Sequence, residues 1–226
     1  MNKKCALVLG GYVNGYSIIQ ELHECGVQDI VLFDYQRNIA SYSNRIKSFR
    51  IIEKNPESLL KQLTKLHEDY EYIVAFPTDD LQVEMMCQIY DRVSGFCFLP
   101  VHKKNSLKFQ DKYEQYLACE NLGVPYPKTL KIKTTNDLGK LESFLWPIIL
   151  KPTSRRDLTT NVFRSLILQD KQDLSRHANQ LSQFINEGTS FLASEIIPGD
   201  GSNIYAYTSY RSRNGQILNE WIGKKL

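Results

Sequence analysis

Two stretches of this chain carry residues that suit the binding of a phosphorylated ligand. Lys151 closes the apolar run of residues 146–152, so a short strand would hold an ammonium group at its end. Glu195 begins the second stretch, in which Ile196, Ile197 and a Pro-Gly pair follow. A fixed ammonium group neutralises phosphate charge, and an exposed strand edge offers backbone groups to a base. The two stretches therefore predict the two ends of one elongated binding site.

A glycine-containing loop, residues 10–15, follows the first predicted strand and opens a helix. Glycine lets the backbone approach a ligand closely, and helix N-terminal amides favour anions. Gly11 and Asn14 are therefore candidates for binding a substrate. The loop is not G-x-G-x-x-G, although Asp34 ends the second strand where a dinucleotide-binding protein has its acid. Three interpretations of this loop therefore stay open: a tight turn, a substrate-binding loop and a dinucleotide site. The dinucleotide site would imply an oxidoreductase.

Two acidic residues, Asp79 and Asp80, follow a predicted parallel strand, at the edge where such sheets bind ligands. Asp79 is a candidate hydrogen-bond acceptor for substrate, and it is equally suited to capping the next helix. Lys112 is predicted in the first turn of a later helix, where the helix dipole disfavours a cation. That position favours a role for Lys112, although a solvated lysine is an equal alternative.

Composition narrows the class of protein. The chain has 226 residues, 42% of them hydrophobic, and 28 basic against 25 acidic residues give a net charge of +3. This balance is too weak to indicate a nucleic-acid partner, and the lack of an apolar run of about 18 residues predicts no membrane span. The five cysteines form no C-x-x-C pair and the four histidines are dispersed, which predicts free thiols and no metal site. We expect a soluble, cytoplasmic protein.

The first part of the chain alternates strands and helices, which predicts a parallel sheet covered by helices on both faces. Later the pattern changes to strands with interspersed helices and a final hairpin signalled by Asn214-Gly215. We therefore predict an α/β domain over residues 1–104 and an α+β domain over residues 105–226. The predicted strands are 5–9, 30–33, 72–76, 96–99, 128–132, 148–151, 162–168, 191–197, 203–211 and 216–222, and the predicted helices are 16–25, 56–66, 81–90, 111–122, 136–145 and 171–185.

Taken in order, Lys112, Lys151, Glu195 and the closing tyrosine-rich and Gly-Lys-Lys-Leu segments resemble the ATP-grasp superfamily. The resemblance is to carbamoyl-phosphate-synthase-like and D-aspartate-ligase-like carboxylate–amine ligases, and it covers their N-terminal portion only. It implies a Rossmann-like pre-ATP-grasp domain followed by a partial, truncated ATP-grasp domain.

The resemblance also implies roles for individual residues. Lys112 and Lys151 would bind phosphate, and the loop after Lys151, which has no glycine, would use Arg155 and Arg156 instead of backbone amides. The backbone of Ile196 and Ile197 and the carboxylate of Glu195 would contact adenine. Asp200 or Ser202 would contact the ribose. Lys224, beside Lys225, would bind phosphate or an acidic substrate.

Members of this family phosphorylate a carboxylate with MgATP, and an amine then displaces the phosphate. The magnesium ligands would lie beyond residue 226, so we expect a fragment or shortened relative that is inactive or nearly so by itself. The cofactors implied are ATP and Mg²⁺, and the partners are small carboxylates and amines. A non-catalytic nucleotide-binding or small-molecule-binding module is the alternative. An unpaired edge of the last hairpin would favour a homodimer.

Overall fold

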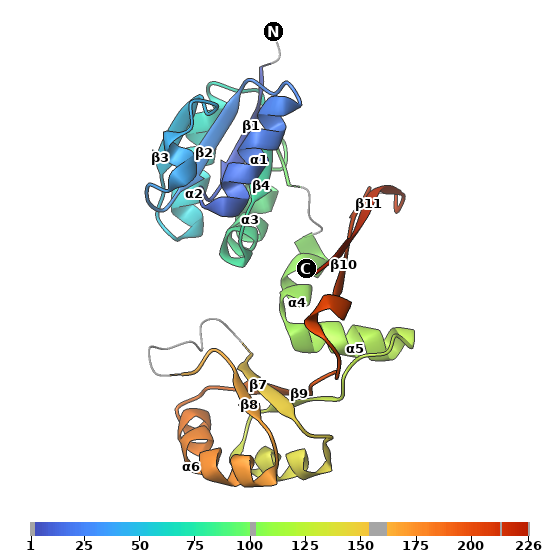
Figure 1. The fold of residues 1–226 in the computed structure, drawn as a ribbon. Helices are drawn as coiled ribbons and strands as arrows, with labels where there is room; N and C mark the ends of the chain where they lie inside the picture. Colours follow the sequence, from blue (N-terminus) through green and yellow to red (C-terminus); the bar gives the residue numbers. More distant parts are fainter. Residues whose placement is uncertain (1–2, 100–102, 154–161, 213, 226) are drawn as a thin grey trace. The chain divides into compact units, whose positions relative to one another are not determined.

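The structure, a computed structural model, describes residues 3–99, 103–153, 162–212 and 214–225. It comprises two compact units, residues 1–115 and 116–226 (Figure 1). The predicted boundary at residues 104 and 105 falls inside a helix, Lys103–Gln110, that belongs to the first unit. Each unit is described by itself below.

The first unit alternates strands and helices as the sequence predicts. Its elements are β1 (Lys4–Leu9), α1 (Val13–Glu24), β2 (Ile30–Asp34), the 3-10 helix η1 (Ile39–Tyr42), β3 (Ser48–Ile51), α2 (Pro56–His67), β4 (Tyr72–Pro77), α3 (Asp80–Val93), β5 (Cys97–Phe98), α4 (Lys103–Gln110) and the start of α5 (Lys112–Leu122).

All strands of this unit are parallel and lie in the order β3-β2-β1-β4-β5. Side chains of a strand alternate between its two faces. Leu7 and Leu9 of β1 accordingly share one core with Leu59 of α2, while Val8 shares another with Ile19 of α1. The strand order reverses between β1 and β4, and open parallel sheets bind ligands outside the carboxyl ends of the strands at such a point.

The second unit comprises the rest of α5 and β6 (Thr129–Ile132), the 3-10 helix η2 (Thr135–Ser143), β7 (Ile148–Pro152), β8 (Leu166–Leu168), α6 (Lys171–Asn186), β9 (Phe191–Glu195), the 3-10 turn η4 (Gly201–Asn203), β10 (Tyr205–Arg211) and β11 (Ile217–Lys224). Four strands form an antiparallel sheet in the order β6-β9-β7-β8. Ile148, Leu150 and Phe191 share a buried core with Leu174 of α6 and Leu141 of η2.

The predicted fold class is confirmed: a parallel sheet with helices is followed by a separate α+β unit. Several helix boundaries follow from local chemistry that the sequence shows. Asn55 caps α2 by accepting a hydrogen bond from the Ser58 N–H, and Pro56 occupies the first turn. Asp111 likewise accepts a hydrogen bond from the Tyr113 N–H at the start of α5.

Other predicted elements were wrong in extent or type. β3 and α4 were missed. Residues 135–143 form a 3-10 helix instead of an α-helix, in a segment that contains the weak helix formers Asn136, Asp137 and Gly139. The strand predicted over residues 162–168 includes only Leu166–Leu168. Before it, the Phe163 ring stacks on Phe191 with 5.3 Å between ring centroids.

The last hairpin is present, but its connection is longer than the predicted two-residue turn. Arg211 pairs with Ile217 after a register shift, so the connection spans residues 212–216. Gly215 in it has φ +85°, a conformation that glycine adopts without a steric penalty. β9 also ends two residues earlier than predicted, at Glu195.

Candidate functional site

A pocket of about 610 Å³ lies at the carboxyl ends of β1, β2 and β4 in the first unit. It is the crevice that the strand order predicts. Its lining includes three of the four predicted substrate residues, and the full set is Gly10, Gly11, Tyr12, Val13, Asn14, Asp34, Tyr35, Gln36, Asn38, Lys54, Thr78, Asp79 and Gln82. Asn14 is exposed in the first turn of α1, and no side chain caps that helix.

Asp34 fastens the loop after β1 to the end of β2. Its buried carboxylate accepts hydrogen bonds from the Gly11 N–H at 2.7 Å, the Tyr35 N–H at 2.7 Å and Asn38 Nδ2 at 2.8 Å. The Gly11 N–H is therefore already bonded within the protein, and substrate binding at Gly11 stays a prediction. Asp34 stabilises the wall of the pocket.

Two other glycines of the loop are required by packing. Gly10 has φ +87°, and a Cβ there would run into the side chains of Thr78 and Gln82. A Cβ at Gly15 would run into the carbonyl of Gly10. The tight turn that the sequence left open as an alternative is therefore present, and it brings the start of α1 close to β4.

Asp79 caps α3, as its capping preference predicts. Its Oδ1 accepts a hydrogen bond from the Gln82 N–H at 2.8 Å, and the Gln82 side chain accepts from the N–H groups of Asp79 and Thr78 in return. Gln82 is buried, so this reciprocal arrangement fixes one wall of the pocket. Substrate binding by Asp79 stays a prediction.

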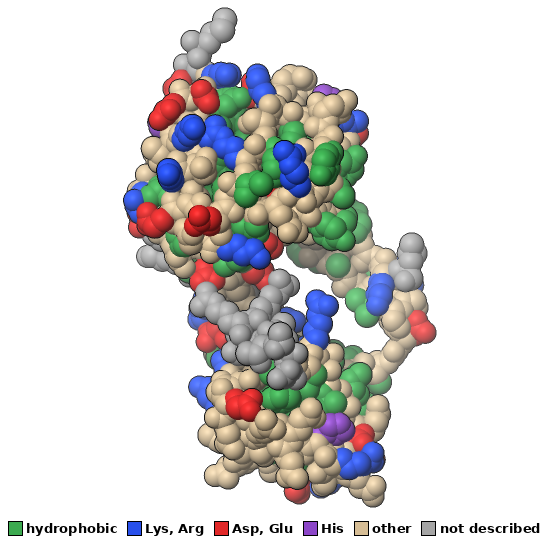
Figure 2. Space-filling model, turned by 90° about the vertical axis from the view of Figure 1, so that its left-hand side faces the viewer, with side chains coloured by type: hydrophobic (Ala, Val, Ile, Leu, Met, Phe, Trp, Pro, Cys, Tyr) green, Lys and Arg blue, Asp and Glu red, His purple; other side chains and the backbone are tan. Residues whose placement is uncertain are grey.

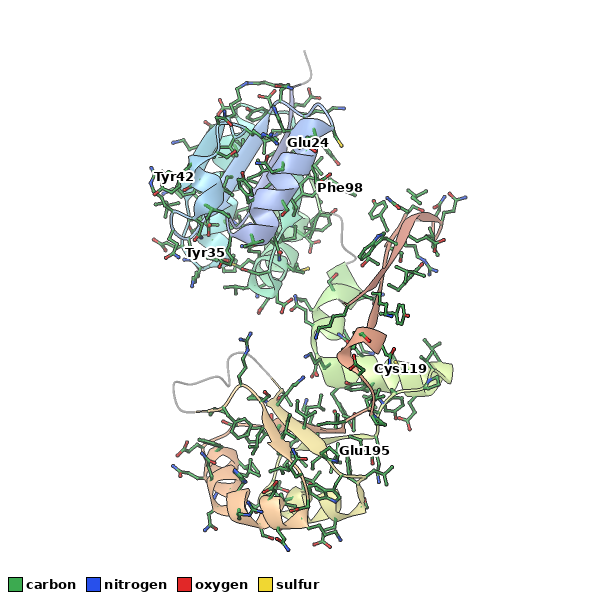
Figure 3. The ribbon with its side chains drawn as sticks, in the orientation of Figure 1. Glu24, Tyr35, Tyr42, Phe98, Cys119 and Glu195 are labelled. Atoms are coloured by element: carbon green, nitrogen blue, oxygen red, sulfur yellow. The ribbon has the colours of Figure 1, made fainter. Side chains whose placement is uncertain are left out.

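The pocket also contains a neutral phenol and a cation. Burial, together with the nearby charges of Asp79 and Asp34, raises the pKa of Tyr35, which therefore keeps its proton at neutral pH. The Lys54 Nζ lies 5.1 Å from the centroid of the Tyr35 ring. Figure 3 labels Tyr35 at this end of the parallel sheet. The pocket thus offers hydrogen-bond donors, amide side chains and one ammonium group.

In the second unit, the sheet face opposite the core carries two lysines in one row. Leu192 of β9 pairs with Lys131 of β6 on one side and with Lys151 of β7 on the other. Because adjacent strands lie about 4.8 Å apart, the two lysine backbones lie about 10 Å apart. The neighbouring row holds Thr129 and Ser194, whose hydroxyl groups are hydrogen-bonded at 3.1 Å. This face therefore combines two ammonium groups with two hydroxyl groups.

A backbone carbonyl without a ladder partner follows β9, at Ile196. The Ile196 N–H donates to the Pro147 carbonyl at 3.1 Å, one residue beyond the Ile148–Glu195 pair. Residues of such a pair normally exchange two bonds, but Pro147 has no N–H to return. The Ile196 carbonyl makes no backbone hydrogen bond to any described residue. It lies four residues from Leu192, about 13 Å at ~3.3 Å per residue.

The contact of the Ile196 and Ile197 backbone with adenine stays a prediction. The Ile196 N–H is bonded to Pro147, so the carbonyl is the backbone group of Ile196 that remains for such a contact. Ile197 is 71% exposed and lies outside β9. One oxygen of Glu195 accepts a hydrogen bond from the Leu145 N–H at 2.7 Å, which ties the end of β9 to the segment after η2 (Figure 3).

Asp200 and Ser202 are close together in η4. The Asp200 carboxylate accepts a hydrogen bond from the Ser202 N–H at 2.7 Å, and this bond lowers the pKa of Asp200. Asp200 is thus ionised at neutral pH and caps the turn. Contact of either residue with a ribose stays a prediction.

Known proteins share the fold of this chain. No protein-family model matches the sequence. The ADP complex of N5-carboxyaminoimidazole ribonucleotide synthetase aligns with 100% of this chain at a TM-score of 0.74 and 14% identity. An L-amino acid ligase from Bacillus licheniformis aligns with 99% of the chain at a TM-score of 0.67 and 14% identity. The chain has the fold of the N-terminal half of ATP-grasp carboxylate–amine ligases.

Sequence relatives agree with the ATP-grasp fold. A formate-dependent phosphoribosylglycinamide formyltransferase of Wolinella succinogenes is 21% identical over 213 residues, 94% of this chain and 51% of its own length. A D-aspartate ligase of Enterococcus faecium is 21% identical over 237 residues, 97% of this chain and 56% of its own length. The two solved structures are likewise covered over 54% and 50% of their chains. The chain therefore spans about half the length of these relatives.

The other predicted site residues belong to different elements or lie outside the described residues. Lys112 is exposed at the first residue of α5 and belongs to the first unit. Lys224 is exposed on β11, with its Nζ 5.7 Å from the Tyr205 ring. Arg155 and Arg156 lie outside the described residues. Their roles stay predictions.

Lys131 is the site residue that sequence reasoning missed. The alternation of residues 129–132 could have found it, since Leu130 and Ile132 pack on the core and Lys131 must point the other way. No group of three or more His, Cys, Asp or Glu that could hold a metal is found in the described ranges. Within those ranges, no helix has the length and apolarity needed to cross a membrane.

Proposed function

We propose that the second unit binds ATP on the sheet face that carries Lys131 and Lys151, as the nucleotide-binding half of a carboxylate–amine ligase. The observation that carries the proposal is the pattern along β9, where the Ile196 carbonyl lies about 13 Å from the lysine row. An exocyclic amine can donate to that carbonyl while the ammonium groups neutralise phosphates. Two solved neighbours of this fold contain ADP or ATP.

ATP would supply the phosphoryl group that activates a carboxylate as an acyl-phosphate for attack by an amine. Lys151, exposed at the end of a core strand, would orient the phosphates, and Lys131 would add a second positive charge across Leu192. Ser194 and Thr129 would line the path between base and phosphates. Mg²⁺ is proposed with ATP, with its ligands supplied by polypeptide other than the described residues.

The pocket of the first unit is the proposed site of a small carboxylate or amine substrate. Asn14 and Lys54 supply polar groups of different kinds around one space. The start of α1 adds amides that carry no side-chain cap. We propose a cytoplasmic location in agreement with the five cysteines, which are all free thiols.

The test is isothermal titration of the chain with MgATP, compared with Lys151→Met. We expect a loss of at least tenfold in affinity, because a charge-assisted contact contributes about 1.5–3 kcal/mol. Lys171→Met is the matched control, since Lys171 is an exposed lysine at the start of α6 whose ion pair with Glu142 is long, 3.7 Å. Absence of ATP binding, or equal losses in the two variants, would reject the proposal.

A further inference from the structure

A second pocket of the first unit, about 540 Å³ in volume, lies between α1 and the segment that contains η1. α1 contributes Tyr16 and Gln20 to its lining, η1 contributes Ile39 and Tyr42, and residues 43–45 complete it. This pocket shares no lining residue with the one at the carboxyl ends of the parallel strands. It is a separate hollow, to which the proposed function gives no role.

Arg45 is the charged residue of this lining. Its side chain is 31% exposed, and its Nη1 is buried without a hydrogen-bond partner among the described residues. Glu24 Oε1 lies 3.5 Å from that Nη1, but the Glu24 side chain is 66% exposed, and an exposed ion pair contributes little. Half-buried cations are normally paired and hydrogen-bonded. The guanidinium of Arg45 therefore lacks the acceptor that its burial calls for.

A second half-buried arginine in the same unit has protein partners. Arg50 of β3 is 21% exposed, and its Nη1 donates to the carbonyl and the side-chain oxygen of Gln62, both at 3.4 Å. Its Nη2 lies 3.8 Å from Asp69 Oδ2, and its guanidinium lies 5.6 Å from the centroid of the Phe33 ring. Arg45 has no such set of partners among the described residues, which leaves its N–H groups for a ligand.

Neutral donors lie beside this guanidinium. Ser43 Oγ accepts a hydrogen bond from the Arg45 backbone N–H at 3.2 Å, which leaves the hydroxyl proton for another acceptor. Asn44 and Gln20 add side-chain amides to the same lining. A planar guanidinium with neutral donors around it suits the oxygen atoms of a carboxylate or a phosphate group.

The rest of the lining is apolar and aromatic. Tyr42 is 75% exposed, Ile39 48% and Tyr16 39%. The Arg37 guanidinium lies 5.9 Å from the centroid of the Tyr42 ring and adds positive charge beside the pocket. Basic and hydrophobic side chains also lie next to one another on the face of the first unit that Figure 2 shows. Exposed tyrosine rings stack well on a flat aromatic group.

We propose that this pocket binds a small organic anion in which an aromatic ring carries a carboxylate or a phosphate group. The oxygen atoms would accept from Arg45 and Ser43, and the ring would lie against Tyr42 and Tyr16. Charge and ring contribute together, so neither an uncharged aromatic molecule nor a bare oxyanion should bind as tightly. The site is independent of nucleotide binding in the second unit.

NMR titration of the ¹⁵N-labelled chain without nucleotide tests the proposal. The probes are phenyl phosphate and benzoate, with benzamide as an uncharged analogue and inorganic phosphate as an anion without a ring. We expect saturable shifts of the amides of residues 43–45 with phenyl phosphate, benzoate or both. Benzamide and inorganic phosphate should bind at least tenfold more weakly. The tighter of the two aromatic anions identifies the preferred oxyanion.

Two variants separate the charge from the ring. Arg45→Met should reduce the affinity at least tenfold, and Tyr42→Ala, at an exposed position, should reduce it without removing the charge. Arg92→Met is the matched control, because Arg92 is an exposed arginine of the same unit, paired with Glu57 at 2.8 Å. The absence of saturable shifts with both aromatic anions overturns the proposal. Equal affinities for benzamide and benzoate, or equal losses in Arg45→Met and Arg92→Met, overturn it as well.

Discussion

The Ile196 N–H donates to the Pro147 carbonyl at 3.1 Å, and Pro147 has no N–H with which to return the bond. The missing donor leaves an acceptor at the end of β9, on the strand that also carries Leu192 between two lysines. A proline in the neighbouring strand thus decides which backbone group of Ile196 a ligand can meet. The arrangement predicts a preference for a base with an exocyclic amine.

We expect ATP to bind at least tenfold more tightly than inosine triphosphate, in which a carbonyl oxygen replaces the amine. The Ile196 carbonyl would then face another acceptor, and the loss of one hydrogen bond costs about 1–1.5 kcal/mol or more. Competition titration with both nucleotides measures the ratio. Equal affinities would show that the amine does not meet this carbonyl.

Lys131 is expected to contribute to nucleotide affinity by its charge. Lys131→Met should reduce ATP affinity about tenfold and AMP affinity less, because the ammonium group lies in the row proposed for the distal phosphates. Lys131→Arg should retain most of the affinity. Equal losses for ATP and AMP in Lys131→Met would indicate a structural effect on the sheet instead.

Gly15→Ala should destabilise the first unit. The added Cβ meets the carbonyl of Gly10, so α1 and the loop after β1 must separate, at a cost of about 1–3 kcal/mol in the free energy of unfolding. Gly95→Ala is the control in the same unit, because no atom lies within 4 Å of a Cβ there. Hydrogen exchange of the β1 amides, measured at increasing urea concentrations, reports the free energy of unfolding of this unit. Equal stability of the two variants would contradict the packing described.

Asp137 should make the second unit sensitive to acid. The hydrogen bond from Lys140 Nζ, with those from the Lys133 and Thr134 N–H groups, holds the pKa of Asp137 well below its ordinary range. A pKa lowered by folding means that the carboxylate stabilises the fold above the unfolded value of about 3.9, and that this contribution disappears as the pH falls through the folded value.

Asp137→Asn should therefore lower the free energy of unfolding by about 1 kcal/mol at pH 7 and by progressively less below about pH 4. Both tryptophans, Trp146 and Trp221, belong to the second unit, so their fluorescence during urea unfolding follows it. Glu120→Gln, a change at an exposed position of α5, serves as the control. A difference in the free energy of unfolding between Asp137→Asn and the parent chain that stays constant down to pH 2 would show that the Asp137 carboxylate is not its cause.

The thiols should react in two classes. Burial raises the pKa of Cys5 and of Cys97 to about 12, whereas Cys25 is exposed. With a disulfide reagent at pH 8, we expect Cys25 to react rapidly and the three buried thiols, Cys5, Cys87 and Cys97, to react only as the first unit opens. Cys25→Ser should remove the fast phase. Persistence of that phase would assign it to Cys119, which is partly exposed, instead of Cys25.

Local sequence was sufficient for most elements and for several site residues. Asn55 and Asp111 cap helices where their side chains predict it, and Lys151 ends a core strand as the apolar run before it requires. Asp79 caps α3 as its residue type favours. These features depend on groups a few residues apart, so the sequence contains the information that determines them.

Tertiary pairing decided the rest. β3 is an edge strand with little apolar signal, and it is defined by its bonds to β2. Lys131 joins Lys151 only because β9 lies between β6 and β7, and the Gly11 N–H is occupied only because β2 brings Asp34 beside it. The Ile196 carbonyl has no ladder partner because Pro147, the residue before β7, lies opposite it. Each of these contacts joins residues distant in the chain, and their register follows from burying one face of each sheet.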